Sequence, residues 1–245
     1  MKIGELIEKA WSQYCENIGE WFLILLCMGL VTMGVSLCFF PVILFFLFLE
    51  AIFVESIGGY SVITIFFLIP VICSLRLLME AMSIGGYSSI SLSKVKSGCC
   101  NIGDIFYIFY HHPFKFMGLL LLTGIYICLW SLLLIIPGIV KIYSYSQAIF
   151  IMIENPEYGI NECITKSMEI MDGNKRYLFL FTLIAGAFYL LVSFILYFTN
   201  TIVIYLVNIS LSFVTTPFYY LFSANFYVKV SGENTEAEMI PGQTI

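Results

Sequence analysis

Residues 116–136 read FMGLLLLTGIYICLWSLLLII and contain no charged side chain. An α-helix needs about 20 mostly apolar residues to cross the hydrocarbon core of a bilayer, so this stretch predicts a transmembrane helix. Other apolar runs predict further spans, at residues 21–40, 61–82, 138–153, 177–199 and 202–228. Together they predict an all-α protein, a polytopic transmembrane helical bundle of about six spans.

The composition of the whole chain agrees with a membrane protein. Of its 245 residues, 60% are hydrophobic and 11% are charged, whereas a soluble domain carries about 25% charged residues. The apolar runs leave no room for a water-soluble module, so we expect one transmembrane domain over residues 21–230. No basic cluster with interleaved aromatic residues is present, and nucleic acid is therefore not expected as a partner.

The first 20 residues form two faces when they are arranged as a helix. Glutamates and lysines fall on one side, and apolar residues fall on the other. A short helix of this kind is expected to lie along the membrane surface, before the first span. Its apolar side consists of Ile3, Leu6, Ile7, Ala10, Trp11, Tyr14 and Ile18.

Residues 41–60 are apolar but interrupted. Pro41, Glu50, Glu55 and Gly58–Gly59 break the run, which predicts a re-entrant or interfacial segment at the outer face rather than a span. Glu50 could face a cavity and accept a proton or a cation, but we favour anchoring of an interfacial helix by both glutamates.

The distribution of lysine sets the expected orientation. If residues 41–60 do not span, the lysines near the N-terminus and those at 94–115 and 166–175 fall on one side of the membrane, and only Lys141 lies near the other. Cytoplasmic loops collect Lys and Arg. The sequence therefore predicts that both termini are cytoplasmic.

Two further segments belong to this inner side. Asn155–Pro156 predicts a turn, and Ile160, Ile164, Met168 and Met171 then mark one face of a helix near 160–173 on the inner surface. The tail at 231–245 is polar and acidic without periodicity, and we expect it to be disordered.

Polar side chains within the predicted spans are the candidate functional residues, because ionisable groups in a membrane are costly. Arg76 and Glu80 are four residues apart and are expected to form an ion pair with a structural role. The runs 141–147 and 208–225 are expected to face the bundle interior, as the lining of a cavity or as interhelical hydrogen bonds. The candidates are Arg76, Glu80, Lys141, Tyr145, Gln147, Asn208 and Asn225.

The sequence offers little catalytic chemistry. Cys99–Cys100 and His111–His112 share one predicted cytoplasmic loop, but adjacent cysteines lack the C-x-x-C spacing of structural zinc sites. No nucleophile–base pair, phosphate loop or hydrolase motif is present. We therefore expect no enzymatic activity, no cofactor and no metal.

A set of motifs lies in the last 150 or so residues. They begin with Trp130-Ser131-Leu132 and Ile135–Ile139 with Lys141, and later include Asn155-Pro156, Pro217-Phe218-Tyr219 and Ala224-Asn225-Phe226-Tyr227. In this order they resemble the pattern of a bacterial family called domain of unknown function 975. Glu154 stands where the family usually has Asp, and 182–187 lacks the usual Trp-containing stretch. The resemblance implies a six-span protein of the bacterial cytoplasmic membrane, without an established substrate, cofactor or catalytic residue.

Two classes of function are favoured over a third, a membrane-embedded enzyme that acts on lipid, for which the nucleophile–base pair is missing. The first is a non-enzymatic membrane protein that supports transport or membrane protection, with 141–147 and 208–225 lining its interior. The alternative is a scaffold or regulator, in which the N-terminal helix and the 160–173 helix dock a protein partner at the cytoplasmic face. In both, the lipid bilayer is the principal partner.

Overall fold

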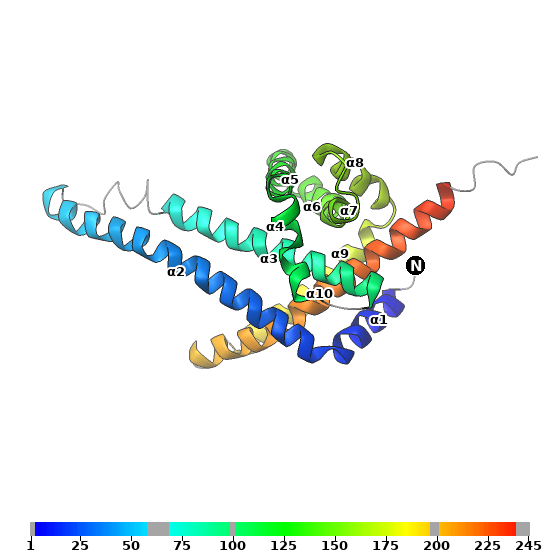
Figure 1. Ribbon diagram of the computed structural model, residues 1–245, viewed down its shortest axis with the longest axis horizontal. Helices are drawn as coiled ribbons and strands as arrows, with labels where there is room; N and C mark the ends of the chain where they lie inside the picture. The colour runs from blue at the N-terminus through cyan, green and yellow to red at the C-terminus, as the bar shows by residue number, and fades with distance from the viewer. Residues whose placement is uncertain (1–2, 58–68, 99–100, 197–200, 239–245) are drawn as a thin grey trace, which may run out of the picture. The chain divides into compact units, whose positions relative to one another are not determined.

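The computed structural model describes residues 3–57, 69–98, 101–196 and 201–238, and over these residues it contains helices and no strand (Figure 1). This confirms the all-α class. The elements are α1 (Ile3–Glu16), α2 (Ile18–Ile57), α3 (Ile69–Ser97), η2 (Ile102–Phe106), α4 (Tyr107–His111), α5 (Pro113–Leu133), α6 (Ile135–Tyr145), α7 (Ala148–Glu154), α8 (Ile160–Ile170), α9 (Lys175–Leu196) and α10 (Thr201–Glu238).

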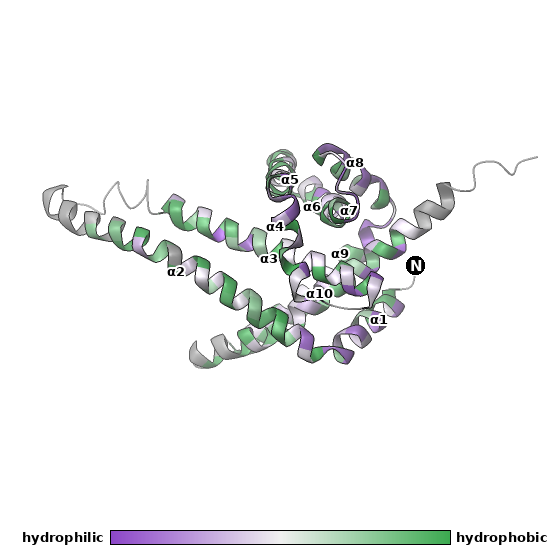
Figure 2. Cartoon of the chain, in the orientation of Figure 1, coloured by the Kyte–Doolittle hydropathy of each residue, from purple (hydrophilic) through white to green (hydrophobic). Residues whose placement is uncertain are grey.

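Five helical segments within the described residues are long and apolar enough to cross a membrane. They are Ile18–Phe45, Ile69–Ser97, Pro113–Leu133, Ile135–Glu154 and Lys175–Leu196. Figure 2 shows the hydrophobic residues along these helices. The sixth predicted span, 202–228, falls on α10. Several side chains near the start of this helix are not among those that the structure describes. The sixth span remains a prediction.

The chain divides into two compact units. One comprises residues 22–84, and the other, which we call the core unit, comprises residues 1–21 together with 85–245. In the first unit, α2 continues through Pro41 to Ile57. Pro41 was expected to end the first span, but the helix runs on without a break. At about 1.5 Å per residue, α2 is about 60 Å long, roughly twice the thickness of the hydrocarbon core.

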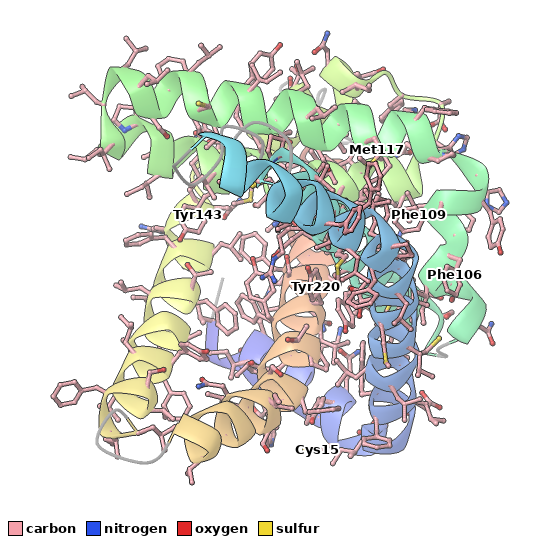
Figure 3. The ribbon with its side chains drawn as sticks, turned by 90° about the vertical axis from the view of Figure 1, so that its left-hand side faces the viewer. Cys15, Phe106, Phe109, Met117, Tyr143 and Tyr220 are labelled. Carbon is pink, nitrogen blue, oxygen red and sulfur yellow. The ribbon has the colours of Figure 1, made fainter. Side chains whose placement is uncertain are left out.

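The core unit combines a packed interior with helical stretches whose apolar side chains are exposed. Its buried side chains gather in the second half of α3, the first turns of α5 and α9, α7, α8 and the second half of α10. Tyr87 and Tyr220, for example, pack with ring centroids 5.2 Å apart (Figure 3). Beyond these turns, α5 and α9 expose leucine, isoleucine and phenylalanine almost continuously. Such an exterior suits lipid.

The N-terminal helix α1 is amphipathic as predicted, and part of its apolar side is covered by protein. Leu6, Ala10 and Tyr14 are buried, and α1 packs along α10. These three residues therefore contact protein, and the position of α1 along the membrane surface remains a prediction. Periodicity identified the face, whereas its partner lies about 200 residues away.

The turn between α5 and α6 is also displaced from its predicted position. The helical break falls at Leu134, which is extended, whereas Pro137 and Gly138 lie in the first turns of α6. Proline is tolerated in a first turn because the N–H it lacks has no intrahelical partner there. Gly138 contacts Ser131 of α5 so closely that a Cβ would lie 2.2 Å from the serine Oγ.

Two boundaries near the ends of helices differ from the predictions. The predicted loop after residue 82 is helical up to Ser97 in α3 and is followed by η2 and α4. The backbone of α10 continues to Glu238, so the expected disorder is wrong for 231–238, and the remainder of the tail lies outside the described residues. The helix predicted at 160–173 is present as α8, and Gly173 follows it with a positive φ of 72°.

Candidate functional site

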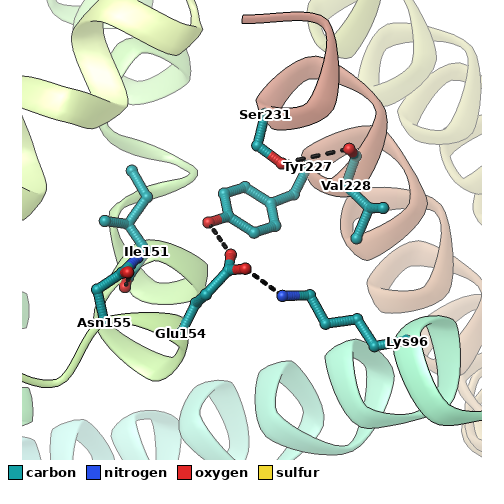
Figure 4. Close-up of polar contacts among 7 residues, drawn as sticks. All are labelled: Lys96, Ile151, Glu154, Asn155, Tyr227, Val228 and Ser231. Carbon is teal, nitrogen blue, oxygen red and sulfur yellow. Dashed lines mark hydrogen bonds and ion pairs between the residues drawn. The ribbon is translucent and has the colours of Figure 1, made fainter. Parts of the chain in front are cut away.

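Glu154, the last residue of α7, connects three helices of the core unit (Figure 4). One oxygen of its carboxylate accepts a 2.5 Å hydrogen bond from the hydroxyl of Tyr227 on α10. The other pairs with the ammonium group of Lys96 on α3. The chain places Glu154 here because α7 ends at the Asn155–Pro156 turn.

The three groups differ in their exposure. Tyr227 is only 2% exposed, and its ring stacks on Phe150 with centroids 5.5 Å apart. The side chains of Lys96 and Glu154 are 41% and 33% exposed. A buried hydroxyl needs a hydrogen-bond partner, so the Tyr227–Glu154 bond satisfies a requirement of the core, while the ion pair stays in contact with water.

A cavity of about 310 Å³ opens beside this ion pair. It lies entirely within the core unit, between the second half of α3, η2, α4 and the end of α7. Its lining residues are Ser89, Leu92, Ser93, Lys96, Asp104, Tyr107, Ile153 and Glu154. None of the seven candidates predicted from sequence belongs to this set.

Arg76 and Glu80 lie on α3 in the other unit and form the expected ion pair, with an N–O distance of 3.3 Å. Both side chains are exposed, at 75% and 55%. The geometry of the pair agrees with the structural interpretation.

Lys141 lies in an aromatic environment on α6. Its ammonium group is 5.0 Å from the centroid of Trp130, 5.6 Å from that of Tyr145 and 3.7 Å from the sulfur of Met168 on α8. Cation–π contacts of this kind stabilise a cation that is partly removed from water. Tyr145, another predicted site residue, thus contacts Lys141 and is buried.

The contact between Lys141 and Met168 corrects the predicted topology. Lys141 was expected near the outer face, and the helix at 160–173 on the inner surface. The two are in contact, so they cannot lie on opposite faces. The physical reason is that the chain turns at Asn155–Pro156, and α8 packs back along α7 and reaches α6.

Gln147 is fully buried at the break between α6 and α7. Ser167 of α8 bridges this break, because its hydroxyl donates a 2.8 Å hydrogen bond to the carbonyl of Ser144 and accepts a 3.2 Å bond from the backbone N–H of Gln147. The side-chain amide of Gln147 donates to the hydroxyl of Ser146. Ser144, Tyr145 and Gln147 are therefore buried in the protein interior, and the Oε1 atom of Gln147 has no hydrogen-bond partner among the described residues.

Asn225 and Asn208 both lie on α10, but in different surroundings. Asn225 is buried, and its amide donates a 2.6 Å hydrogen bond to the side chain of Gln13 on α1 and a 2.9 Å bond to the carbonyl of Leu221. Asn208 is half-buried nearer the start of the helix. The structure thus does not bring the seven predicted residues together into one site.

The predicted loop with cysteines and histidines does not form a metal centre in the part that can be described. Cys99 and Cys100 lie outside the described residues. His111 stacks on Tyr107, with ring centroids 4.5 Å apart. Among the described residues, no three His, Cys, Asp or Glu side chains gather in a way that could hold a metal ion.

Two groups on α8 have perturbed acid–base properties. Burial raises the pKa of the Cys163 thiol, which is completely shielded from solvent. The ammonium group of Lys166 donates a hydrogen bond to the hydroxyl of Tyr158, which raises the pKa of the lysine. Neither arrangement pairs a nucleophile with a base.

Sequence reasoning missed the Glu154 site. Lys96 lies 58 residues before Glu154, and Tyr227 lies 73 residues after it, so no local pattern links them. One signal was present: Glu154 is the first acidic residue after Asp104 and ends a long apolar run. A carboxylate in that position needs a partner.

Comparison of the chain with protein-family models, with curated proteins and with solved structures finds no match.

Proposed function

We propose that this chain is a non-catalytic protein of the bacterial cytoplasmic membrane, a scaffold or regulator that docks a protein partner at the cytoplasmic face. Membership of the domain of unknown function 975 family is part of this proposal, and it rests on the motifs around Trp130, Pro137 and Pro217. The proposed cytoplasmic orientation rests on the lysines near the packed core, because cytoplasmic loops collect Lys and Arg.

One observation carries the proposal, namely the two-sided exterior of the core unit. Around α8 the exterior is polar and encloses a packed core, whereas the far parts of α5 and α9 expose apolar side chains. A helical protein made only for lipid contact has no need of a polar, folded end. We interpret this end as the part that works in water.

The polar residues of the helices support the same choice. The backbone N–H of Gln147 donates to the hydroxyl of Ser167, and the side-chain amide of Asn225 donates to Gln13. The hydroxyl of Tyr143 (Figure 3) lies 2.7 Å from that of Thr182. Each of these contacts joins two helices or two parts of a broken helix. The bonds fit a structural role better than the lining of a transport path.

The exposed side of α8 is the surface we assign to the partner. It presents Asn161, Glu162, Thr165 and Glu169 to solvent. Charge complementarity then favours a partner with a basic surface, because opposite potentials speed association and exclude wrong partners.

Site-specific photo-crosslinking in living cells tests this assignment. A crosslinker at Thr165 should give a discrete adduct with one protein, and a crosslinker at Leu190, an exposed residue of α9, should give none. Replacing Glu162 and Glu169 with lysine should abolish the adduct, because the charge that attracts the partner is reversed. Absence of a discrete adduct, or its persistence in the charge-reversed variant, contradicts the proposal.

The transport alternative predicts a different result. If polar residues of the spans line a path, then replacing Lys141, Tyr145 and Asn208 with Met, Phe and Leu should abolish the cellular phenotype of the protein while the α8 adduct persists. We expect the phenotype to be retained in this triple variant and lost in the charge-reversed one.

A further inference from the structure

The cavity beside Glu154 contains a charged group that the described part of the chain leaves without a partner. The carboxylate of Asp104 on η2 is half-buried at this cavity, and no hydrogen bond or ion pair joins it to the residues described. Ser89 also borders the cavity, but its hydroxyl oxygen is shielded from it. Withdrawing a charged group from water is costly unless the charge is paired, so the carboxylate points to an occupant from outside the chain.

The charges of the lining indicate the sign of that occupant. The cavity presents two carboxylates, Asp104 and Glu154, and one ammonium group, that of Lys96. Lys96 and Glu154 pair with each other, which leaves the negative charge of Asp104 uncompensated. The occupant should therefore carry a positive charge.

The nature of the other lining groups favours an organic cation over a metal ion. Divalent metal ions need several oxygen or nitrogen ligands, and no cluster of three such acidic, His or Cys groups occurs among the described residues. The cavity instead combines Asp104 with Ser93 and with the apolar side chains of Leu92 and Ile153. An alkyl chain that ends in an ammonium group matches this combination.

We infer that the cavity lined by Ser89, Ser93, Asp104 and Glu154 binds a small molecule that bears a primary ammonium group. The ammonium donates a hydrogen bond to the Asp104 carboxylate, and its carbon chain packs against Leu92 and Ile153. A volume of about 310 Å³ lies at the lower end of small-molecule sites, which run from about 300 to 1,000 Å³. The inference stands independently of the partner proposed for α8.

Two sources can supply this chemistry, a soluble amine and the ethanolamine headgroup of a phospholipid. The test uses the full chain in nanodiscs of phosphatidylglycerol alone, titrated by calorimetry with putrescine and, as a neutral analogue of similar length, with 1,4-butanediol. A second arm measures the thermal midpoint in nanodiscs with and without phosphatidylethanolamine. Together the arms distinguish the free amine from the headgroup.

Matched variants localise the binding. Asp104→Asn should weaken putrescine binding at least tenfold, because it removes a charge-assisted hydrogen bond. Asp172→Asn, the same change at an exposed carboxylate after α8, should leave binding unchanged. Ser93→Leu, at a half-buried position of the lining, should block the cavity without altering its charge.

Each possible outcome either supports or overturns the inferred ammonium site. Binding of putrescine but not butanediol, with loss in Asp104→Asn and Ser93→Leu, supports a soluble amine. A raised thermal midpoint with phosphatidylethanolamine, absent in Asp104→Asn, supports the headgroup. The inference is overturned if neither probe acts, if butanediol binds as well as putrescine, or if Asp172→Asn has the same effect as Asp104→Asn.

Discussion

The hydroxyl of Tyr227 on α10 donates a 2.5 Å hydrogen bond to the carboxylate of Glu154 on α7, across a sequence separation of 73 residues. The same carboxylate pairs with Lys96 on α3. One side chain thus connects α3, α7 and α10. It also forms a wall of the cavity.

Replacing Tyr227 with Phe should lower the free energy of unfolding by about 1–2 kcal/mol, since a hydrogen bond to a charged group contributes about 1.5–3 kcal/mol and Glu154 is partly exposed. Denaturant unfolding of the protein in detergent measures the change. Tyr110→Phe, at a position that is 81% exposed, is the matched control. Equal stability of the two variants would show that the Tyr227 bond contributes nothing.

The transmembrane helices were predictable because their signal is local. An apolar run such as 116–136 contains its own evidence, and α5 occupies Pro113–Leu133, close to the predicted bounds. Helix breaks were less predictable. Pro41 lies within a continuous α2, whereas the chain breaks at Leu134, where no proline or glycine marks it. The close packing of Gly138 against Ser131 determines the break at Leu134.

The contacts of the core unit were not predictable from periodicity. Sequence showed that Leu6, Ala10 and Tyr14 share a face but not that α10 covers it. The sequence also indicated that residues 141–147 face the interior, but it did not show that Ser167 bridges the break between α6 and α7. Such contacts depend on the tertiary arrangement of segments that are distant in the chain, and so does the Glu154 site.

Removing the hydroxyl of Ser167 should open the connection between α6 and α7. In Ser167→Ala, the backbone N–H of Gln147 and the carbonyl of Ser144 lose their shared partner in a fully buried place. We expect a loss of about 1–3 kcal/mol in unfolding free energy, the cost of unsatisfied buried groups. Thr165→Ala is the control, because that exposed hydroxyl bonds only within α8. A loss no larger than the control's would contradict the bridging role.

Adding a methyl group at Gly138 should disrupt the α5–α6 hairpin. A Cβ there would lie 2.2 Å from the Oγ and 3.0 Å from both the Cα and the Cβ of Ser131. Gly138→Ala should therefore cost about 1–3 kcal/mol, as other overpacked sites do. Gly124→Ala, on the same hairpin but with open space around it, should be tolerated. Ser131→Ala should not rescue Gly138→Ala, because the backbone and Cβ contacts remain.

The thiol of Cys163 should be unreactive in the folded protein. It is completely buried, and burial raises its pKa above the ordinary value of 9.0, so both access and the thiolate are lacking at neutral pH. Burial of the neutral thiol stabilises the fold below about pH 9, and this contribution is lost as the pH rises further. Mass spectrometry after maleimide treatment should find Cys163 unmodified at pH 7 and modified after denaturation. Rapid modification of the native protein at pH 7 would contradict its burial.

The exposed Cys15 of α1 offers a direct test of orientation. The predicted cytoplasmic N-terminus requires that a membrane-impermeant maleimide modify Cys15 in inverted vesicles and not in intact cells. The experiment uses a variant with Ser at positions 99 and 100, so that only Cys15 is expected to be reactive on the water side of the core unit. Cys27, Cys38, Cys73 and Cys128 lie in candidate spans, where lipid should shield them from the reagent. Modification of Cys15 in intact cells would place the core unit, and with it the proposed partner surface of α8, outside the cytoplasm.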